Sequence, residues 1–296
     1  MFTTVQDRGR WGFQSRGVPV SGALDWYSHR LANRLLANDQ DAATLEVTMM
    51  GPRMRFEAGT TFAVTGAQFG LAVDDVQVEM NQPCDVRPGS ILTFGERLRG
   101  ARAYVAVAGG IDVPAILGSR STHVLTGMGG LDGRALRTGD VLRIGARGEG
   151  HGEIVRKPES APHPLSLMPS GAKLRAVVAD PRLFANLSVQ RFRVSPRSDR
   201  MGYRLEGESV ADAPTGALIS SAVPTGAIQV PPTGNPILLM NDHATTGGYL
   251  IAATVITADL PLAGQLAPGD WVEFEACSVD AAVEHLRRQE TMLEAT

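Results

Sequence analysis

Short apolar runs, each closed by a turn residue, recur along this chain from one end to the other. Its 296 residues include 33 Gly and 18 Pro, and both are spread throughout the sequence. Gly and Pro mark turns and are rare inside strands, so this spacing is typical of many short strands joined by tight turns. The sequence therefore predicts a mainly β fold with a few helices.

Alternating apolar and β-branched residues place the expected strands. They fall at 45–50, 61–65, 76–80, 91–94, 103–108, 141–144, 175–179, 190–194, 203–206, 227–230, 237–240 and 271–275. Helical spacing follows Ser21-Gly22, and Ser21 and Asp25 are the two candidate caps for that helix. A short helix at 181–187 and an amphipathic helix from Ser278 complete the prediction.

The stretch between Gly145 and Lys173 is rich in Gly and Pro and has little periodicity. We therefore predict an N-terminal domain at 1–150, a linker or long loop at 151–172 and a C-terminal domain at 173–296. Three related turns, at Pro88-Gly89, Thr138-Gly139 and Pro268-Gly269, each lead into an expected strand. They indicate either repeated barrel-like units or convergent turn chemistry.

Charge and apolar content narrow the class of partner and the compartment. A net charge of -3 and a pI near 6.1 give no overall field that would attract nucleic acid or an anionic membrane. No apolar run approaches the roughly 20 residues of a membrane span, and the N-terminus turns polar at once, so the expected location is cytoplasmic. Cys84 and Cys277 lie far apart and are expected to be small buried hydrophobic residues rather than a disulfide.

Familiar catalytic signatures are missing from the sequence. We find no GxxxxGK[ST] phosphate loop, no GxGxxG, no HExxH, no paired CxxC, no GxSxG and no Met-Lys-Met biotin-attachment site. The sequence therefore gives no location for an ATP site, and no metal is expected.

The first polar cluster runs from Gln6 to Asp25 and is rich in Gly and Arg. Arg8 and Arg16 are candidates to bind a carboxylate or phosphate, helped by the helix that starts after Ser21. Asp25 is either a substrate-binding residue or a residue that complements the helix dipole. Asp7 is either part of the site or one half of an ion pair with Arg8 that fixes the loop.

The second half holds two more clusters. Asp199-Arg200 stands before a Gly and a strand, where a turn held by its own hydrogen bonds is an equal alternative to a site. In 220–249, Asp242 and His243 would point to opposite faces of an extended strand, so we prefer Asp242 as the acid or base and treat His243 as structural. The expected hydrogen-bonding groups of this stretch are Gln229, Thr245, Thr246 and Tyr249.

These motifs together resemble one family over nearly the whole chain. They are Gln6-Asp7-Arg8-Gly9-Arg10, Ser198-Asp199-Arg200-Met201-Gly202, Gly226-Ala227-Ile228-Gln229-Val230-Pro231 and Thr245-Thr246-Gly247-Gly248-Tyr249. The family is the biotin-dependent carboxyltransferase-like family, also labelled allophanate hydrolase subunit 2. Its members include the C-type component of bacterial 5-oxoprolinase, the antagonist of the kinase inhibitor KipI, and the carboxyltransferase region of urea carboxylase.

The resemblance implies two cyclophilin-like β-barrel domains and a KipI-like partner, the B-type component of 5-oxoprolinase, with the A-type component as a further partner. It implies Asp25 and Asp242 as catalytic residues of an ATP-dependent complex that opens the lactam of 5-oxoproline. Substrate-binding residues would be Arg8, Arg16, Ser21, Gln229, Thr245, Thr246 and Tyr249, with Asp7, Asp199 and Arg200 as secondary candidates. The alternatives are a carboxyltransferase or allophanate hydrolase-type component acting on urea-like amides, which would need biotin, and a regulatory KipI antagonist without activity.

Overall fold

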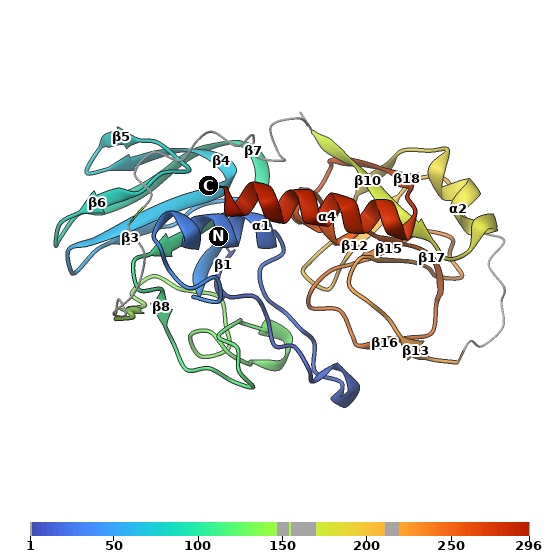
Figure 1. Cartoon of the computed structure of the whole chain (residues 1–296), viewed down its shortest axis with the longest axis horizontal. Coiled ribbons are helices and arrows are strands. Elements are labelled where there is room, and N and C mark those ends of the chain that lie inside the picture. The colour runs from blue at the N-terminus through green and yellow to red at the C-terminus, as the bar shows by residue number, and fades with distance from the viewer. Residues whose placement is uncertain (1, 147–153, 155–169, 211–218, 296) are drawn as a thin grey trace. The chain divides into compact units, whose positions relative to one another are not determined.

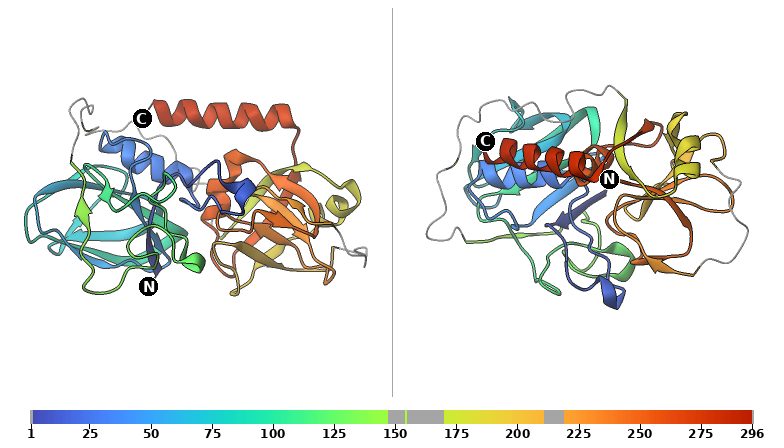
Figure 2. Two further views of the ribbon diagram at one scale, coloured as in Figure 1. Left: turned by 90° about the horizontal axis from the view of Figure 1, so that it is seen from below. Right: turned by 45° about the vertical axis from the view of Figure 1, so that its right-hand side comes forward.

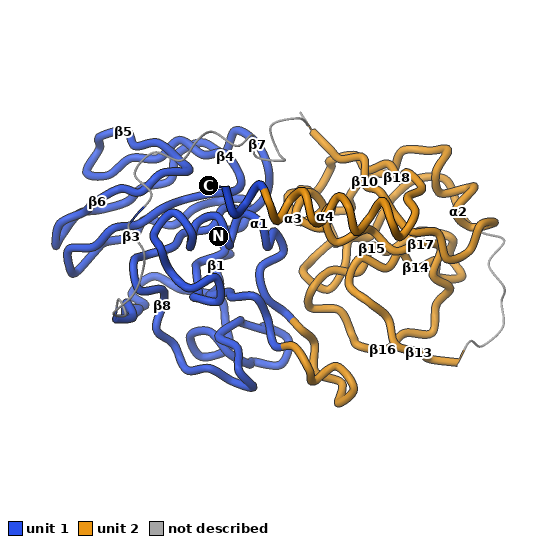
Figure 3. Tube along the Cα trace, viewed as in Figure 1, with its two compact units in different colours: residues 1–10, 21–166, 292–296 blue, residues 11–20, 167–291 orange. Residues whose placement is uncertain are grey.

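The computed structural model describes residues 2–146, 154, 170–210 and 219–295. Within them the chain forms two compact units (Figure 3). Unit 1 comprises Met1–Arg10, Ser21–Ser166 and Met292–Thr296, and unit 2 comprises Trp11–Val20 and Leu167–Thr291. The linker predicted at 151–172 falls mostly outside the described residues, so the division into domains at 150 and 173 stays a prediction.

Unit 1 is built on an antiparallel sheet with strand order β1-β2-β7-β4-β5, to which β3 and β6 add at β7 and β4 (Figure 1). The strands are β1 (Phe2–Gln6), β2 (Thr44–Thr48), β3 (Arg53–Arg55), β4 (Thr60–Val73), β5 (Val76–Val78), β6 (Cys84–Val86) and β7 (Ile91–Val107). A separate pair joins β8 (Ile111–Asp112) to β9 (Arg143–Ile144). The two strands expected at 91–94 and 103–108 are one long strand, because β7 continues through Gly95 and Gly100.

The alternation of β1 divides unit 1 into an apolar and a polar side. Val5 belongs to the main apolar cluster with Leu45, Val47 and Val105. On the other face, Thr4 lies opposite Glu46, and Gln6 lies opposite Thr44. All of these residues are buried, so this sheet carries a polar face that is covered rather than exposed to water.

Helix α1 (Trp26–Leu35) covers that second face of the sheet (Figure 2). Tyr27, Leu31 and Leu35 of the helix form a cluster with Ala63 and Tyr104 of β4 and β7. The helix appears where the sequence predicted it, and Asp25 rather than Ser21 provides the cap, because its carboxylate accepts a hydrogen bond from the backbone N–H of Ser28.

Unit 2 is a closed barrel with strand order β10-β17-β14-β15-β12-β11-β18. The strands are β10 (Gly171–Val178), β11 (Phe192–Val194), β12 (Gly202–Glu206), β14 (Ala227–Val230), β15 (Ile237–Leu239), β17 (Leu250–Val255) and β18 (Trp271–Ala276). Only the β10–β18 pair is parallel among the described pairings of this barrel. A two-stranded ribbon of β13 (Ser221–Ala222) and β16 (Thr246–Gly247) accompanies it.

The remaining helices are α2 (Pro181–Ser188), α3 (Leu260–Gly264) and α4 (Val279–Glu294). The helices predicted at 181–187 and from Ser278 are confirmed, and Asp180 caps α2 through the N–H groups of Arg182 and Leu183. The sequence did not predict helix α3 or the strands β1, β3, β6, β8, β13, β16 and β17. None of the helices in the described residues is long and apolar enough to cross a membrane.

The three related Gly turns share one backbone geometry. Gly89, Gly139 and Gly269 have φ values of 90°, 92° and 90°, which only Gly adopts readily. In each turn, the N–H of the residue after the Gly donates to the carbonyl of the residue two positions before the Gly. The three distances are 3.1, 3.2 and 3.0 Å. These are type II turns, and they lead toward strands β7, β9 and β18.

Candidate functional site

Asp7 is the centre of a buried hydrogen-bond network at the end of β1. Its carboxylate accepts from the N–H of Gly9 at 2.8 Å, from the hydroxyls of Ser119 and Ser121 at 2.7 and 2.5 Å, and from the N–H of Arg120 at 2.5 Å. Arg8, in contrast, is exposed and pairs with Asp41. Asp7 therefore ties the N-terminal segment to the 119–121 loop, while the alternative of an Asp7–Arg8 ion pair stays a prediction.

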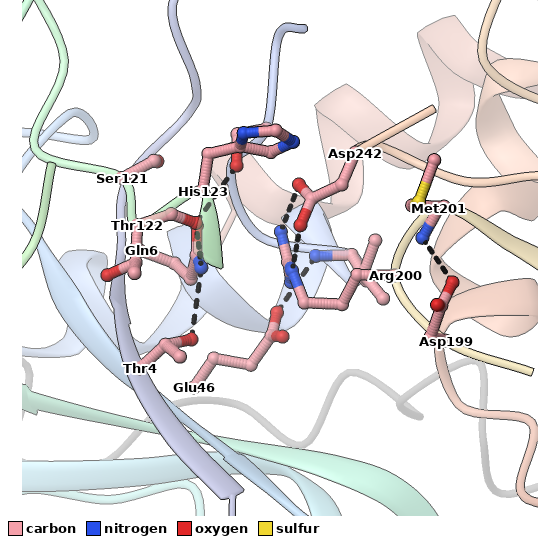
Figure 4. Close-up of polar contacts among 12 residues, drawn as sticks. Thr4, Gln6, Glu46, Ser121, Thr122, His123, Asp199, Arg200, Met201 and Asp242 are labelled. Atoms are coloured by element: carbon pink, nitrogen blue, oxygen red, sulfur yellow. Dashed lines mark hydrogen bonds and ion pairs between the residues drawn. The ribbon is translucent and has the colours of Figure 1, made fainter. Parts of the chain in front are cut away.

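The end of β1 also holds the next residue of that loop, Thr122 (Figure 4). The N–H and hydroxyl of Thr122 both donate to the carbonyl of Val5, at 2.9 Å each. The amide nitrogen of Gln6 donates to the carbonyl of Thr122 at 3.1 Å and to the hydroxyl of Thr4 at 3.0 Å. This arrangement leaves the amide oxygen of Gln6 buried and without a hydrogen-bond partner among the described residues.

His123 follows directly and is 3% exposed. Its backbone forms a two-bond bridge with Met128, and its Nδ1 lies 2.7 Å from the hydroxyl of Thr126. Its Nε2 is buried and finds no hydrogen-bond partner in the part of the chain that the structure describes. The sequence reasoning missed His123, since a single His in a Gly-rich loop carries no motif.

Arg10 is the buried cation of the same region, with 1% of its surface exposed. It donates to the carbonyl of Ser121, and a Cβ placed on Gly129 would lie 2.8 Å from its Nη2. The predicted carboxylate-binding arginines, Arg8 and Arg16, are both exposed. Arg10 is therefore better placed than either for an anion that is shielded from water, because the attraction is stronger there.

Asp25 and Ser21 are fully buried at the start of α1. The Asp25 carboxylate accepts from both the N–H and the hydroxyl of Ser28, at 2.8 and 2.5 Å, and the Ser21 hydroxyl donates to the carbonyl of Thr122 at 3.1 Å. Both contacts are structural, so the helix-capping alternative for Asp25 is the one that the geometry favours. Catalytic use of Asp25 stays a prediction.

Glu46 lies on the covered polar face of the sheet and is fully buried. It accepts from the N–H of Leu24 at 3.0 Å and from the phenol of Tyr104 at 2.7 Å, and Arg102 pairs with it at 3.7 Å. Burial, followed by the negative charge of Glu46, raises the pKa of Tyr104 well above its usual value. Tyr104 therefore stays protonated and accepts from the N–H of Asp25 at 2.8 Å while it donates to Glu46.

In unit 2, Asp242 and Arg200 form a buried ion pair (Figure 4). Two guanidinium nitrogens, Nε and Nη2, reach the two carboxylate oxygens at 2.9 and 3.1 Å. Asp199 is exposed and accepts from the N–H groups of Met201 and Gly202, so it closes a local turn. Asp242 and His243 lie in a turn after β15 rather than on an extended strand, so the expected opposite-face geometry is wrong.

Gln229 keeps a buried hydrogen-bonding group open. It is 5% exposed, and its amide nitrogen is buried without a partner among the described residues. A Cβ on Gly247 would lie 2.5 Å from that nitrogen, so the Gly keeps space for the amide under the β13–β16 ribbon. Thr245 joins the ribbon through its carbonyl, while Thr246 and Tyr249 are exposed.

His243 has a defined tautomer. Its Nδ1 lies 2.7 Å from the carbonyl of Ala244, and since a carbonyl only accepts, Nδ1 carries the proton. Nε2 then accepts from the hydroxyl of Thr225 at 3.1 Å. Burial lowers the pKa of His243, so the ring is neutral and both nitrogens are used within the fold. This agrees with the structural interpretation of His243.

Two hollows of about 470 and 500 Å³ lie in unit 1 and share Asp112 and Arg120. None of the residues predicted from the sequence lines either of them. The described residues also contain no group of His, Cys, Asp or Glu that would hold a metal ion, and both cysteines are free.

In chemical terms, the unit 1 cluster offers an open imidazole nitrogen at His123 and an open amide oxygen at Gln6. The unit 2 cluster offers an open amide N–H group at Gln229. Leaving such groups buried and unpaired costs about 1–3 kcal/mol each, which a bound polar ligand or water recovers. Groups of this kind suit a neutral, planar amide or urea better than a metal or a nucleic acid.

Comparison with known proteins places these features in a family. Residues 16–276 match the family described as "Carboxyltransferase domain, subdomain A and B". This chain belongs to that carboxyltransferase-domain family. The resemblance inferred from the motifs is thus confirmed.

Curated relatives of this carboxyltransferase-domain chain carry two kinds of name. It is 37% identical over 300 residues to the C subunit of 5-oxoprolinase from Escherichia coli, covering 99% of this chain and 94% of that protein. The chain is also 35% identical to the urea amidolyase of Lachancea kluyveri. That match covers 99% of this chain but 17% of the relative.

A solved structure gives the same picture. The urea amidolyase of Kluyveromyces lactis superposes with a TM-score of 0.88 at 32% sequence identity, covering 99% of this chain and 19% of that one. The mainly β fold is therefore shared with a carboxyltransferase-domain protein. The chain spans less than a fifth of the length of these urea amidolyases and nearly the whole of the bacterial 5-oxoprolinase component.

Proposed function

We propose that this chain is the C-type component of an ATP-dependent 5-oxoprolinase, a hydrolase that opens the lactam ring of 5-oxoproline. The near-complete, two-way match to the C subunit of E. coli 5-oxoprolinase carries the proposal. The urea amidolyases are much longer than this chain, whereas the 5-oxoprolinase relatives have its size. The subunit name of these relatives supports a chain that works as one component of an assembly.

Open hydrogen-bonding groups support a substrate of this chemistry. A lactam presents one carbonyl oxygen and one N–H, and 5-oxoproline adds a carboxylate. Within unit 2, the Gln229 amide N–H group suits a carbonyl or carboxylate oxygen. Within unit 1, Gln6 offers an amide oxygen to an N–H donor.

The partners follow from the same proposal. A KipI-like B-type component and an A-type component would complete the complex, because the sequence contains no phosphate-binding loop and ATP must be handled elsewhere or at a non-standard site. Since the complex consumes ATP, we place it in the cytoplasm. We also propose that both units are barrels of the cyclophilin-like type.

Reconstitution tests the function directly. The purified chain is mixed with its A-type and B-type partners, and glutamate release from 5-oxoproline is followed with and without ATP. We expect ATP-dependent glutamate that disappears when this chain is left out. A complex that forms with the B-type partner but never releases glutamate would instead favour a regulatory KipI antagonist.

A carboxyltransferase acting on urea is the second candidate, favoured by the TM-score of 0.88 to the K. lactis urea amidolyase. It requires a biotin carboxylase and a biotinylated carrier domain, which this sequence does not contain as a Met-Lys-Met motif. Carboxylation of urea by the chain in the presence of a carboxybiotin carrier would support it. Genes for such proteins beside this one would be the earliest sign.

A further inference from the structure

The 119–123 loop of unit 1 is held at every position before its histidine. Ser119, Arg120 and Ser121 bond the Asp7 carboxylate, and Thr122 bonds Val5 and Gln6. All of these anchors come from residues 5–7. So many bonds to successive loop residues fix the position of the next residue, His123, with little freedom.

His123 itself is oriented by a second set of contacts. Its N–H donates to the carbonyl of Met128 at 2.8 Å, and its carbonyl accepts from the N–H of Met128 at 3.2 Å. The Thr126 hydroxyl lies 2.7 Å from Nδ1 and 3.5 Å from the carbonyl of His123. A hydroxyl can donate to Nδ1 or accept an Nδ1–H. In the second arrangement Nε2 is an unprotonated base, and this is the tautomer that the inference requires.

The guanidinium of Arg10 belongs to the same turn. It donates to the carbonyl of Ser121, and Gly129, which follows the His123–Met128 bridge, leaves room for its Nη2. Gly129 has a φ of 71° and its Cβ would also lie 2.0 Å from the carbonyl of Ser121, so no other residue fits there. Arg10 thus helps to hold the turn, and the imidazole of His123 keeps an Nε2 without a hydrogen-bond partner among the described residues.

We propose that His123 is a proton-transfer residue of this protein; the assignment rests on the proposed function. In the hydrolytic step, Nε2 of His123 takes a proton from water as its oxygen adds to the lactam carbonyl carbon. The same proton then passes to the ring nitrogen as the C–N bond breaks. The proton count is unchanged.

The kinetic test uses the reconstituted complex of this chain with its A-type and B-type partners. We expect His123→Gln to lower kcat about 100-fold or more and to flatten the acidic side of the pH–rate profile, because acid–base groups contribute roughly 10²–10⁴-fold. The KM for 5-oxoproline should change less than about 3-fold, since binding is left in place. His285→Gln, on helix α4, is the matched control and should stay within about 2-fold of the wild type.

Thr126→Val separates positioning from chemistry. It removes the hydroxyl beside Nδ1 but keeps the imidazole, so we expect a kcat loss of about 10-fold together with a shift of the pH–rate profile. A His123→Gln complex that folds, assembles and keeps kcat within about 3-fold of the wild type would overturn the proposal.

An NMR experiment tests the role of His123 separately from the proposed function. If the wild-type complex releases no glutamate, the proposed function is wrong, and the His123 resonance can still be measured. With ¹⁵N-labelled histidine, we expect His123 in the Nδ1–H tautomer and an Nε2 resonance that shifts when 5-oxoproline or urea is added to the complex. The Nε2–H tautomer, or no shift with either probe, would mean that the nitrogen binds only water and would overturn the inference.

Discussion

In unit 1 the Asp7 carboxylate is bound by neutral donors from several segments, whereas in unit 2 the Asp259 carboxylate is clamped by one arginine. Asp7 accepts from backbone N–H groups and serine hydroxyls. Asp259 accepts from Nε, Nη2 and the backbone N–H of Arg175, at 2.9, 2.5 and 2.7 Å. The side chain of Asp259 is 1% exposed, and that of Arg175 is 31% exposed.

The difference teaches that the cost of losing a buried polar contact depends on what remains. Removing Asp7 leaves neutral donors, which water satisfies at modest cost. Removing Arg175 leaves a buried negative charge, and an unpaired buried charge is among the most costly groups in a protein. Two carboxylates with similar numbers of hydrogen bonds therefore predict different losses of unfolding free energy when one partner is removed.

Arg175→Met should have the largest effect. We expect it to lower the free energy of unfolding by about 3–5 kcal/mol, because the Asp259 carboxylate loses its charged partner. Lys173→Met is the matched control on the same strand, since Lys173 and Glu275 form a pair in which both side chains are about half exposed; it should cost at most about 1 kcal/mol. Denaturant unfolding followed by tryptophan fluorescence measures both, and equal losses would contradict the comparison.

His29 of unit 1 makes stability depend on pH. Burial lowers its pKa from 6.5 to about 4, and its neutral ring accepts from Thr44 and donates to the carbonyl of Gln40. Above pH 6.5 the ring is neutral whether folded or unfolded, so its contribution is complete there. As the pH falls from 6.5 to about 4, only the unfolded chain takes up the proton, and roughly 3 kcal/mol of stability is lost.

His29→Gln should remove most of that pH dependence. Its denaturation midpoint is expected to change much less between about pH 7 and pH 4.5 than that of the wild type. His243→Gln in unit 2 is the comparison variant, since burial also lowers the pKa of His243. If the wild type and His29→Gln lose the same stability on acidification, another group carries the effect.

Asp7→Ala tests the neutral-donor side of the comparison. We expect a loss of about 2–3 kcal/mol, smaller than for Arg175→Met, because the donors left behind carry no charge. Hydrogen exchange should rise at the N–H groups of Gly9 and Arg120, which Asp7 binds. Asp199→Ala, at an exposed turn, should cost about 1 kcal/mol or less.

Gly247→Ala addresses the open amide of Gln229. The new Cβ would lie 2.5 Å from that amide nitrogen, so the side chain must move, at about 1–2 kcal/mol of stability. If the amide binds substrate, the KM for 5-oxoproline in the reconstituted complex rises while the pH–rate profile is unchanged. Gly70→Ala is the control, because nothing lies within 4 Å of a Cβ at that strand position.

The smallest effect is expected at the shared type II turns. Gly269→Ala in unit 2 and Gly139→Ala in unit 1 each place a side chain at a φ near +90° with no neighbour within 4 Å. Both should therefore cost about 1 kcal/mol from backbone strain alone. A large difference in melting temperature shift between the two variants would show that the turns are not equivalent.

The local pattern of the sequence predicted most of the secondary structure, because it depends on neighbouring residues. The helix after Asp25, the helix at Pro181 and the strand at 227–230 all follow from caps, Pro placement and alternation. The missed strand β17 has the sequence Leu250-Ile251-Ala252-Ala253-Thr254-Val255, an apolar run that does not alternate clearly. The turn at Asn241–His243 was missed although the predicted strand ended at residue 240 and Asn-Asp is a local turn signal; the error lay in extending the strand geometry to Asp242 and His243.

For the candidate site, the sequence picked out polar motifs but could not assign their roles. The carboxylates of Asp7 and Asp25 hold a loop and cap a helix, and their use in a site stays a prediction. Gln229 kept an open group as its motif suggested. His123 and Arg10 became visible only once burial was known, because a group's missing partner and its exposure are properties of the packed chain.

What the sequence determined by itself is the mainly β class, the family and the residues that can carry polar chemistry, since these rest on periodicity and on motifs within a few residues. Only the tertiary structure decided which of them are used to hold the fold together. Ser119–Ser121 reach Asp7 across more than a hundred residues, at separations of 112, 113 and 114. Contacts over such distances are set by the topology of the sheet and its loops, which a local pattern does not encode.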